Sequence, residues 1–117
     1  MSGFDVSRSD KSEISVLYLS GFLDAHTTPK FEDGLQSLIK ENRVKIIVNL
    51  KDLDYISSAG LGVFMGFIEE IREKGGDIKL SNLSQKVFKV FDLLGFPALY
   101  EIFDEEAEAT EKFSETK

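Results

Sequence analysis

Hydrophobic and polar positions along this chain follow two different periods, which predict strands and helices in turn. Apolar and β-branched runs predict five strands, at residues 4–7, 14–20, 44–50, 77–80 and 99–102. Apolar residues at helical spacing predict four helices, one after each strand from the second onward. The order ββαβαβαβα is typical of an α/β domain, a mixed sheet with largely parallel neighbours flanked by about four helices. We expect one such domain over residues 1–117.

The residues between these segments predict where the elements begin and end. Thr27 or Thr28 can cap the first helix, and Pro29 suits its first turn. Two glycines, Gly75 and Gly76, are typical of a helix C-terminus and close a helix expected over residues 59–73. The polar stretch 51–54 predicts a turn after the third strand.

Two adjacent serines, Ser57 and Ser58, stand just before the predicted helix over residues 59–73. A hydroxyl in this position is a common N-cap, and a helix N-terminus is also a common place to hold a phosphate. If residues 59–61 form the first helical turn, Ser58 is the N-cap, with its oxygen near the amides of Gly60 and Leu61. A serine there can be a nucleophile or a substrate for phosphorylation, and the rest of the chain has to distinguish the two.

A serine hydrolase would need a nucleophile elbow, Gly-x-Ser-x-Gly, and a base. Around Ser58 the first glycine of that motif is missing, because Ile56 stands in its place. The only histidine, His26, follows a different strand, and nothing in the sequence requires it to meet Ser58. A loop imidazole is the favoured interpretation of His26, and a hydrolase using Ser58 and His26 is the less favoured function.

The glycines after the serines do not make a nucleotide site. The run from Gly60 has Met65 where a dinucleotide-binding turn needs its third glycine, and no phosphate-loop pattern is present. Gly62 and Gly66 share one helix face, and packing of that face against the sheet is favoured over docking of a partner. The acids at positions 24, 52 and 54 lack metal-ligand spacing, and turn chemistry explains Asp52 and Asp54, so we expect neither a metal nor a cofactor.

Composition excludes several classes of protein. The chain has no cysteine, which rules out disulfides and cysteine nucleophiles, and its net charge of −7 argues against a nucleic-acid backbone as partner. No apolar run reaches the roughly 18 residues that span a membrane, and no signal peptide is visible. We therefore expect a cytoplasmic protein. The acidic segment of about 104–117 predicts a final helix, capped by Asp104, with a solvated face and a frayed end.

The stretch Asp54–Val63 resembles the signature of STAS domains, specifically bacterial anti-sigma factor antagonists. The resemblance extends to Gly21-Phe-Leu-Asp24, to the strand Ile46–Leu50 and to Val87–Gly95. The family's common signature is Asp-Ser-Ser/Thr-Gly-Leu-Gly, with the first of the paired hydroxyl residues phosphorylated. Aligned on the glycines, that residue falls on Ser58. Here Ser57 replaces the family's aspartate and Ala59 replaces the second hydroxyl residue.

The resemblance implies partner switching. The unphosphorylated antagonist binds an anti-sigma factor that is also a serine protein kinase, phosphorylation at Ser58 (second choice Ser57) releases it, and a metal-dependent PP2C-type phosphatase resets the cycle. A STAS scaffold in a signalling or transport assembly, without phosphorylation, is the alternative. The residues expected to bind the partner are Asp24, His26, Ser57, Ser58, Ala59, Gly60, Leu61 and Gly62.

Overall fold

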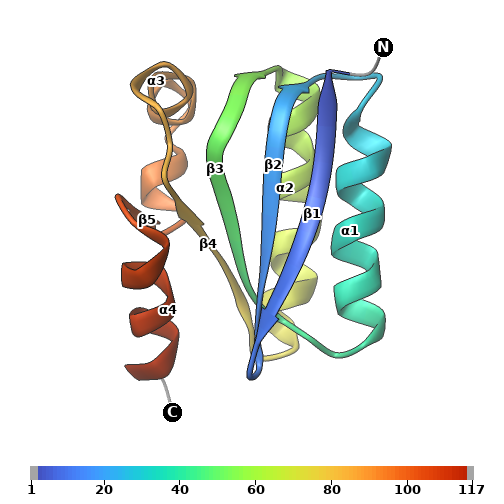
Figure 1. Ribbon diagram of the computed structural model, residues 1–117, viewed down its shortest axis with the longest axis vertical. Coiled ribbons are helices and arrows are strands. Elements are labelled where there is room, and N and C mark those ends of the chain that lie inside the picture. Colours follow the sequence, from blue (N-terminus) through green and yellow to red (C-terminus); the bar gives the residue numbers. More distant parts are fainter. Residues whose placement is uncertain (1–2, 116–117) are drawn as a thin grey trace.

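The computed structural model describes residues 3–115 and contains five strands, four α-helices and one 3₁₀ helix (Figure 1). The strands are β1 (Phe4–Lys11), β2 (Ile14–Leu23), β3 (Lys45–Ile56), β4 (Asp77–Ser81) and β5 (Ile102–Phe103). The helices are α1 (Thr28–Lys40), α2 (Ser58–Glu73), α3 (Gln85–Leu93), the 3₁₀ helix η1 (Phe96–Ala98) and α4 (Glu106–Glu115). This order confirms the predicted α/β class.

The five strands form one sheet in the order β1-β2-β3-β4-β5, antiparallel between β1 and β2 and parallel elsewhere. Successive parallel strands joined by crossovers of one hand place their helices on one face of a sheet. Accordingly α1, α2 and α3 all contribute to the same hydrophobic core. Figure 1 shows α4 on the opposite side of the sheet from α1, beside its lower half.

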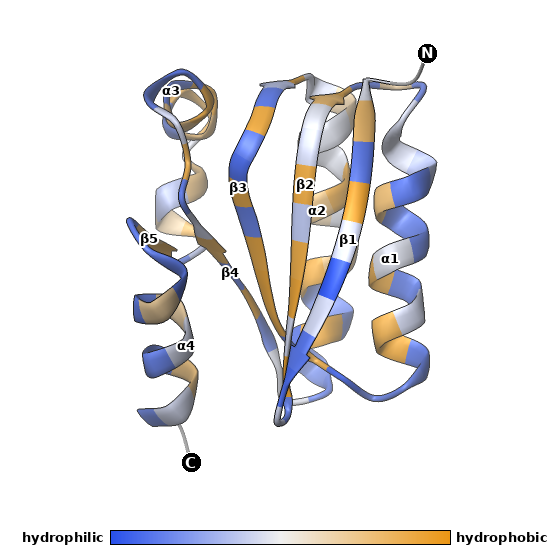
Figure 2. Cartoon of the chain, viewed as in Figure 1, coloured by the Kyte–Doolittle hydropathy of each residue, from blue (hydrophilic) through white to orange (hydrophobic). Residues whose placement is uncertain are grey.

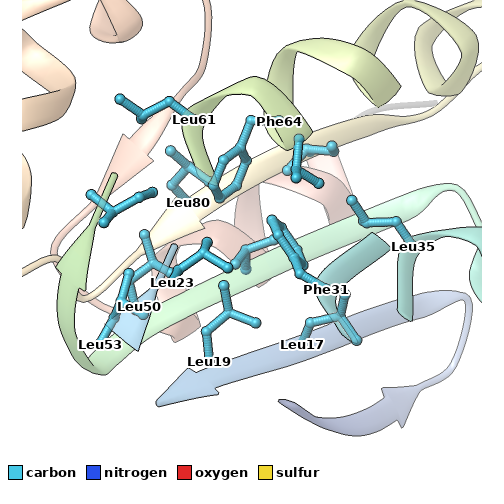
Figure 3. Close-up of a cluster of buried hydrophobic side chains, with 14 of the residues drawn as sticks. Leu17, Leu19, Leu23, Phe31, Leu35, Leu50, Leu53, Leu61, Phe64 and Leu80 are labelled. Atoms are coloured by element: carbon cyan, nitrogen blue, oxygen red, sulfur yellow. The ribbon is translucent and has the colours of Figure 1, made fainter. Parts of the chain in front are cut away.

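The main core lies between the sheet and the first three helices, as the leucines and phenylalanines in Figure 3 show. Strand residues alternate between faces. Leu17 and Leu19 therefore point into this core, while Val16 joins a smaller cluster under α4, and Figure 2 shows the matching alternation of hydrophobic and hydrophilic residues. At the centre, the ring of Phe64 makes edge contacts with Phe31 and Phe91, at centroid distances of 4.9 and 5.6 Å.

Strand β3 continues to Ile56, so the turn predicted at residues 51–54 is wrong. β2 also runs further than predicted, to Leu23, and its last residues pair with β3 through two register shifts. Those shifts absorb the extra polar residues of β3 as bulges. Asp52 and Asp54 consequently lie exposed on a strand and not in a loop.

The strand predicted at residues 99–102 is displaced, because Tyr100 is held in the core. Its ring stacks on Phe96 at 5.4 Å, and its hydroxyl donates to the carbonyl oxygen of Phe64 at 2.7 Å. The chain around it forms the 3₁₀ helix and a bend, and pairing begins only at Ile102. Strand β1 is longer than the predicted 4–7, since all eight of its residues pair with β2.

Helix α4 is fixed to the sheet by one face, which the acidic composition of the segment does not indicate. Ala109 and Phe113 are buried against the sheet. The carboxylate of Glu106 accepts from the Nζ of Lys11 at 2.8 Å and from the amide of Asn49 at 3.0 Å. The helix begins at Glu106, two residues after the predicted cap at Asp104, and the end of the frayed tail lies outside the described residues.

Candidate docking site at the start of helix α2

The carboxyl ends of β2 and β3 bring the two segments singled out in the sequence side by side. Leu23 and Ile56 are register partners, and the amide of Ser57 donates to the carbonyl oxygen of Leu23 at 2.9 Å. The loop that begins at Asp24 and the serine pair that opens α2 therefore meet at one end of the sheet, at the top of Figure 1.

Ser57, and not Ser58, is the N-cap of α2. Its backbone is extended (φ −97°, ψ 174°), and its side-chain oxygen accepts from the amide of Gly60 at 3.4 Å. The first helical hydrogen bond also begins here, from the amide of Leu61 to the carbonyl oxygen of Ser57 at 3.1 Å. The expectation that Ser58 caps the helix is wrong by one residue, because Ser58 already has helical geometry.

Ser58 occupies the first helical position, and its side chain is exposed to solvent. The amides at the start of a helix have no partner within the helix, and the helix dipole gives this end a partial positive charge. A negative group on the Ser58 hydroxyl would lie at the favourable end of the dipole. The half-buried hydroxyl of Ser57 is meanwhile engaged by the helix backbone.

The loop beside the serines is ordered by its own side chains. The Asp24 carboxylate accepts from the backbone amides of His26 at 2.9 Å and Thr27 at 3.2 Å, as in an Asx turn. Thr27 is the N-cap position of α1 but makes no capping bond, since its hydroxyl donates to the carbonyl oxygen of Phe22 at 2.9 Å. His26 is exposed at the tip of this loop.

The geometry does not assemble a hydrolase. Within residues 3–115, no hydrogen bond connects the imidazole of His26 with Ser57 or Ser58. A nucleophile elbow holds its serine in a strained turn, whereas Ser57 is extended and Ser58 helical. Among the described residues, the site presents an exposed Ser58 hydroxyl with no hydrogen bond to the imidazole of His26.

The glycines of α2 have opposite environments. A Cβ on Gly60 would lie 2.8 Å from the side chain of Leu23 and 2.9 Å from that of Ile56, so this position needs a glycine for helix–sheet packing. Gly62 and Gly66 are exposed, and a Cβ on either would meet nothing within 4 Å. The expectation that Gly62 and Gly66 pack internally is therefore wrong.

Of the eight residues expected to bind a partner, two are buried. Gly60 and Leu61 face the core, while Ser58, Ala59 and Gly62 are exposed on α2 and His26 is exposed on the neighbouring loop. Asp24 and Ser57 are partly exposed.

Sequence reasoning missed three exposed apolar side chains, one on α2 and two at this end of the sheet. Met65, on α2, keeps 48% of its surface exposed and follows Gly62 by three positions, so the two share a helix face. The rings of Phe22 and Tyr55 lie 6.0 Å apart and keep 52% and 44% of their surface exposed. The available signal was strand alternation, because Leu23 and Ile56 face the core and their preceding neighbours must then face away.

The described residues form neither a metal-binding cluster nor a membrane-spanning helix. Among the described residues, no group of three or more His, Cys, Asp or Glu side chains is placed to hold a metal ion. None of the helices in residues 3–115 is both long and apolar enough to cross a membrane.

Comparisons with known proteins match the chain over most of its length. The STAS domain family model matches residues 6–109. The anti-sigma-B factor antagonist of Bacillus subtilis is 30% identical over 95 residues, which are 81% of this chain and 85% of the relative. The anti-sigma-B factor antagonist of Listeria monocytogenes is 28% identical over 104 residues, 89% of this chain and 90% of the relative.

Solved structures agree with the sequence comparisons. The unphosphorylated form of the anti-sigma factor antagonist SpoIIAA superposes with a TM-score of 0.80 at 26% identity, covering 97% of this chain and 98% of that one. The phosphorylated form of SpoIIAA from Bacillus gives a TM-score of 0.72 at the same identity, covering 94% and 98%. The arrangement of strands and helices described above is therefore shared with regulatory proteins of known structure.

Proposed function

Because the chain belongs to the STAS domain family, we propose that it is an anti-sigma factor antagonist whose binding is switched off by phosphorylation of Ser58. In this function the unphosphorylated protein binds an anti-sigma factor that is also a serine protein kinase, and so releases the sigma factor. The observation that carries the proposal is an exposed hydroxyl at the first position of α2, on the helix face that Gly62 leaves open.

Exposure supports Ser58 as the phosphorylated residue in preference to Ser57. A kinase must reach the hydroxyl, and Ser58 is exposed whereas Ser57 is half-buried and caps the helix. Modification of Ser57 would disturb the capping bond to Gly60, while modification of Ser58 leaves that bond in place. Ala59 has no hydroxyl and cannot compete.

The proposed switch acts through the surface around Ser58. A phosphate adds about −1.5 to −2 charges and three acceptor oxygens, which the start of α2 tolerates because of its unbonded amides and dipole. A partner that packs closely over Ser58 and Gly62 has no room for the phosphate. Its binding would also require removing the water that hydrates the phosphate. Binding is then lost while the fold is retained. A metal-dependent PP2C-type phosphatase that removes the phosphate completes the proposed cycle.

The test combines site mapping with binding. The protein is incubated with ATP and the purified anti-sigma factor kinase encoded in the same genome, and the phosphate is located by mass spectrometry in wild type, Ser58→Ala and Ser57→Ala. We expect modification of wild type and Ser57→Ala at Ser58, and none of Ser58→Ala. A phosphate on Ser57, with Ser58→Ala still modified at full rate, would overturn the assignment.

Binding of the same kinase tests the switch itself. We expect Ser58→Asp to weaken binding at least tenfold, about 1.4 kcal/mol, with an unchanged circular dichroism spectrum. Ser84→Asp is the matched control, since Ser84 is an exposed serine that caps a different helix, α3. Equal binding of Ser58→Asp and wild type would refute the switch. Binding without any phosphorylation would instead support a STAS scaffold in a signalling or transport assembly.

A further inference from the structure

Two large apolar side chains, Phe22 and Tyr55, lie side by side and exposed at the carboxyl ends of β2 and β3. Their ring centroids are 6.0 Å apart with the planes inclined at 37°, so the rings contact each other yet remain about half exposed. Leu23 and Ile56, the residues that follow them, belong to the core under α1 and α2. Strand alternation therefore places the aromatic pair on the other face of the sheet.

Helix α4 does not cover this part of that face. Its buried residues pack with Ile14, Val16 and Ile47, which lie toward the amino-terminal ends of β2 and β3. Figure 1 shows α4 beside the lower half of the sheet, whereas β2 and β3 end at the top. The aromatic pair is thus open to a partner.

The residues around the aromatic pair carry negative charge. Asp54 directly precedes Tyr55 in β3 and is the extra residue of a bulge, so strict alternation does not apply to it. Asp52 pairs in register with Ser20, two residues before Phe22. Both carboxylates are exposed, and neither forms an ion pair within residues 3–115. Aromatic faces beside unpaired carboxylates suit a guanidinium, which is planar, always charged, and able to stack on a ring while donating to an acid.

We propose that Phe22 and Tyr55, with Asp54, receive an arginine side chain of the anti-sigma factor, and that this contact determines which anti-sigma factor the protein binds. The inference rests on the proposed function. The pair is continuous with the docking site, since Phe22 leads through Leu23 into the Asp24 loop and Tyr55 leads through Ile56 into the serines. The partner accordingly contacts α2 on one side of the sheet end and the aromatic pair on the other.

If the partner side chain is an arginine, the variants of this surface should differ in binding in a way that an apolar partner side chain would not produce. Phe22→Ala and Phe22→Leu should each weaken binding about tenfold, because both remove the π face. Phe22→Tyr keeps that face and should bind like wild type. Asp54→Asn should weaken binding about threefold at low salt and reduce its salt dependence. Full binding by Phe22→Leu would show that only apolar contact is used and would overturn the arginine assignment.

Phe88→Ala is the matched control, because Phe88 is an exposed phenylalanine on α3, outside this surface. Binding is measured with the purified anti-sigma factor kinase, and thermal unfolding shows that each variant is folded. If wild type binds and Ser58→Asp does not, but Phe22→Ala matches Phe88→Ala, the inference fails and the proposed function stands.

A partner-independent measurement keeps the inference testable if no anti-sigma factor binds. Acetyl-arginine methylamide, with its lysine and leucine counterparts, is titrated at millimolar concentration into isotope-labelled protein. We expect the arginine derivative alone to shift the ring signals of Phe22 and Tyr55 in wild type, and not those of Tyr55 in Phe22→Ala. No shift with arginine, or equal shifts with leucine, would overturn the proposal.

Discussion

A single residue separates the capping serine from the serine proposed to be phosphorylated, and the two have different tasks. Ser57 closes the backbone at the start of α2 and is half-buried, whereas Ser58 contributes only an exposed hydroxyl. Dividing the tasks allows Ser58 to be modified without the loss of a cap. A stability measurement can test this division independently of any partner.

We expect Ser57→Ala to lower the free energy of unfolding by roughly 0.5–2 kcal/mol, because it removes the N-cap acceptor. Ser58→Ala should change it by less than about 0.5 kcal/mol, the usual limit for an exposed surface position. Urea unfolding of both variants, followed by circular dichroism, makes the comparison. A larger loss in Ser58→Ala than in Ser57→Ala would contradict the assignment of the cap.

The sequence alone located the serine pair and the helix but not which serine caps it. Both serines are acceptable N-caps, and a helix boundary read from hydrophobic periodicity is uncertain by more than one residue. The deciding contact is the hydrogen bond between Ser57 and the carbonyl of Leu23, which depends on a strand far away in sequence. The same limit applies to Phe22 and Tyr55, whose exposure follows from the face that α4 leaves open.

At the scale of elements, α2 has a packed face and an open face, and glycines occur on both. Gly60 lets the helix approach β2 and β3 closely. Gly62 and Gly66 serve no such contact, yet a glycine inside a helix costs about 1 kcal/mol relative to alanine. We propose that the partner requires an open surface at these two positions, which accounts for that cost.

Alanine substitutions on the two faces should therefore have opposite effects on stability. Gly60→Ala should destabilise the protein by about 1–3 kcal/mol, since its methyl group overpacks against Leu23 and Ile56. Gly62→Ala should stabilise it by up to about 1 kcal/mol, while weakening binding of the anti-sigma factor kinase.

Thermal unfolding and a binding assay on the same preparations measure both effects. Gly66→Ala, one helical turn further along, is the control for helix propensity and should give a similar gain in stability. A Gly62→Ala protein that is more stable and binds as tightly as wild type would show that the open face is not part of the interface.

Elements defined by their own periodicity could be predicted from the sequence, and elements defined by tertiary contacts could not. The apolar pattern of α2 identifies Phe64 and Ile71 as core residues, and both are buried, whereas Met65, which belongs to the same pattern, keeps 48% of its surface exposed. The end of β3 depends on β2, whose last residues hold Asp52 and Tyr55 in the sheet through bulges. β5 is shifted because the buried hydroxyl of Tyr100 bonds to α2.

On the scale of the whole molecule, the acidic carboxyl-terminal segment is unevenly charged and yet attached to the sheet. Residues 101–117 contain seven acidic residues and two lysines, a net −5 of the total −7. Glu106 joins this segment to the first hairpin and the sheet centre through Lys11, Tyr18 and Asn49. The polar part of the attachment of α4, beside the buried Ala109 and Phe113, therefore depends on one carboxylate remaining ionised.

Acid should weaken that attachment. Burial opposes ionisation of Glu106, but hydrogen bonds from Lys11, Asn49 and Tyr18 outweigh it and hold its pKa below the usual value. The unfolded chain consequently binds the proton more readily than the folded one. The stabilising contribution of Glu106 is complete above its unfolded pKa of about 4.3 and is lost as the pH falls through the lower folded pKa.

Glu106→Gln should therefore reduce the free energy of unfolding by roughly 1 kcal/mol at pH 7 and make it fall less steeply below pH 5. Some acid dependence should persist, because hydrogen bonds from Arg8 hold the pKa of Asp10 at about 2 and lower that of Glu41. Glu111→Gln, at an exposed position of the same helix, is the control and should follow wild type. Urea unfolding between pH 3 and 7 provides the measurement, and identical acid profiles for Glu106→Gln and Glu111→Gln would show that α4 is attached without its carboxylate.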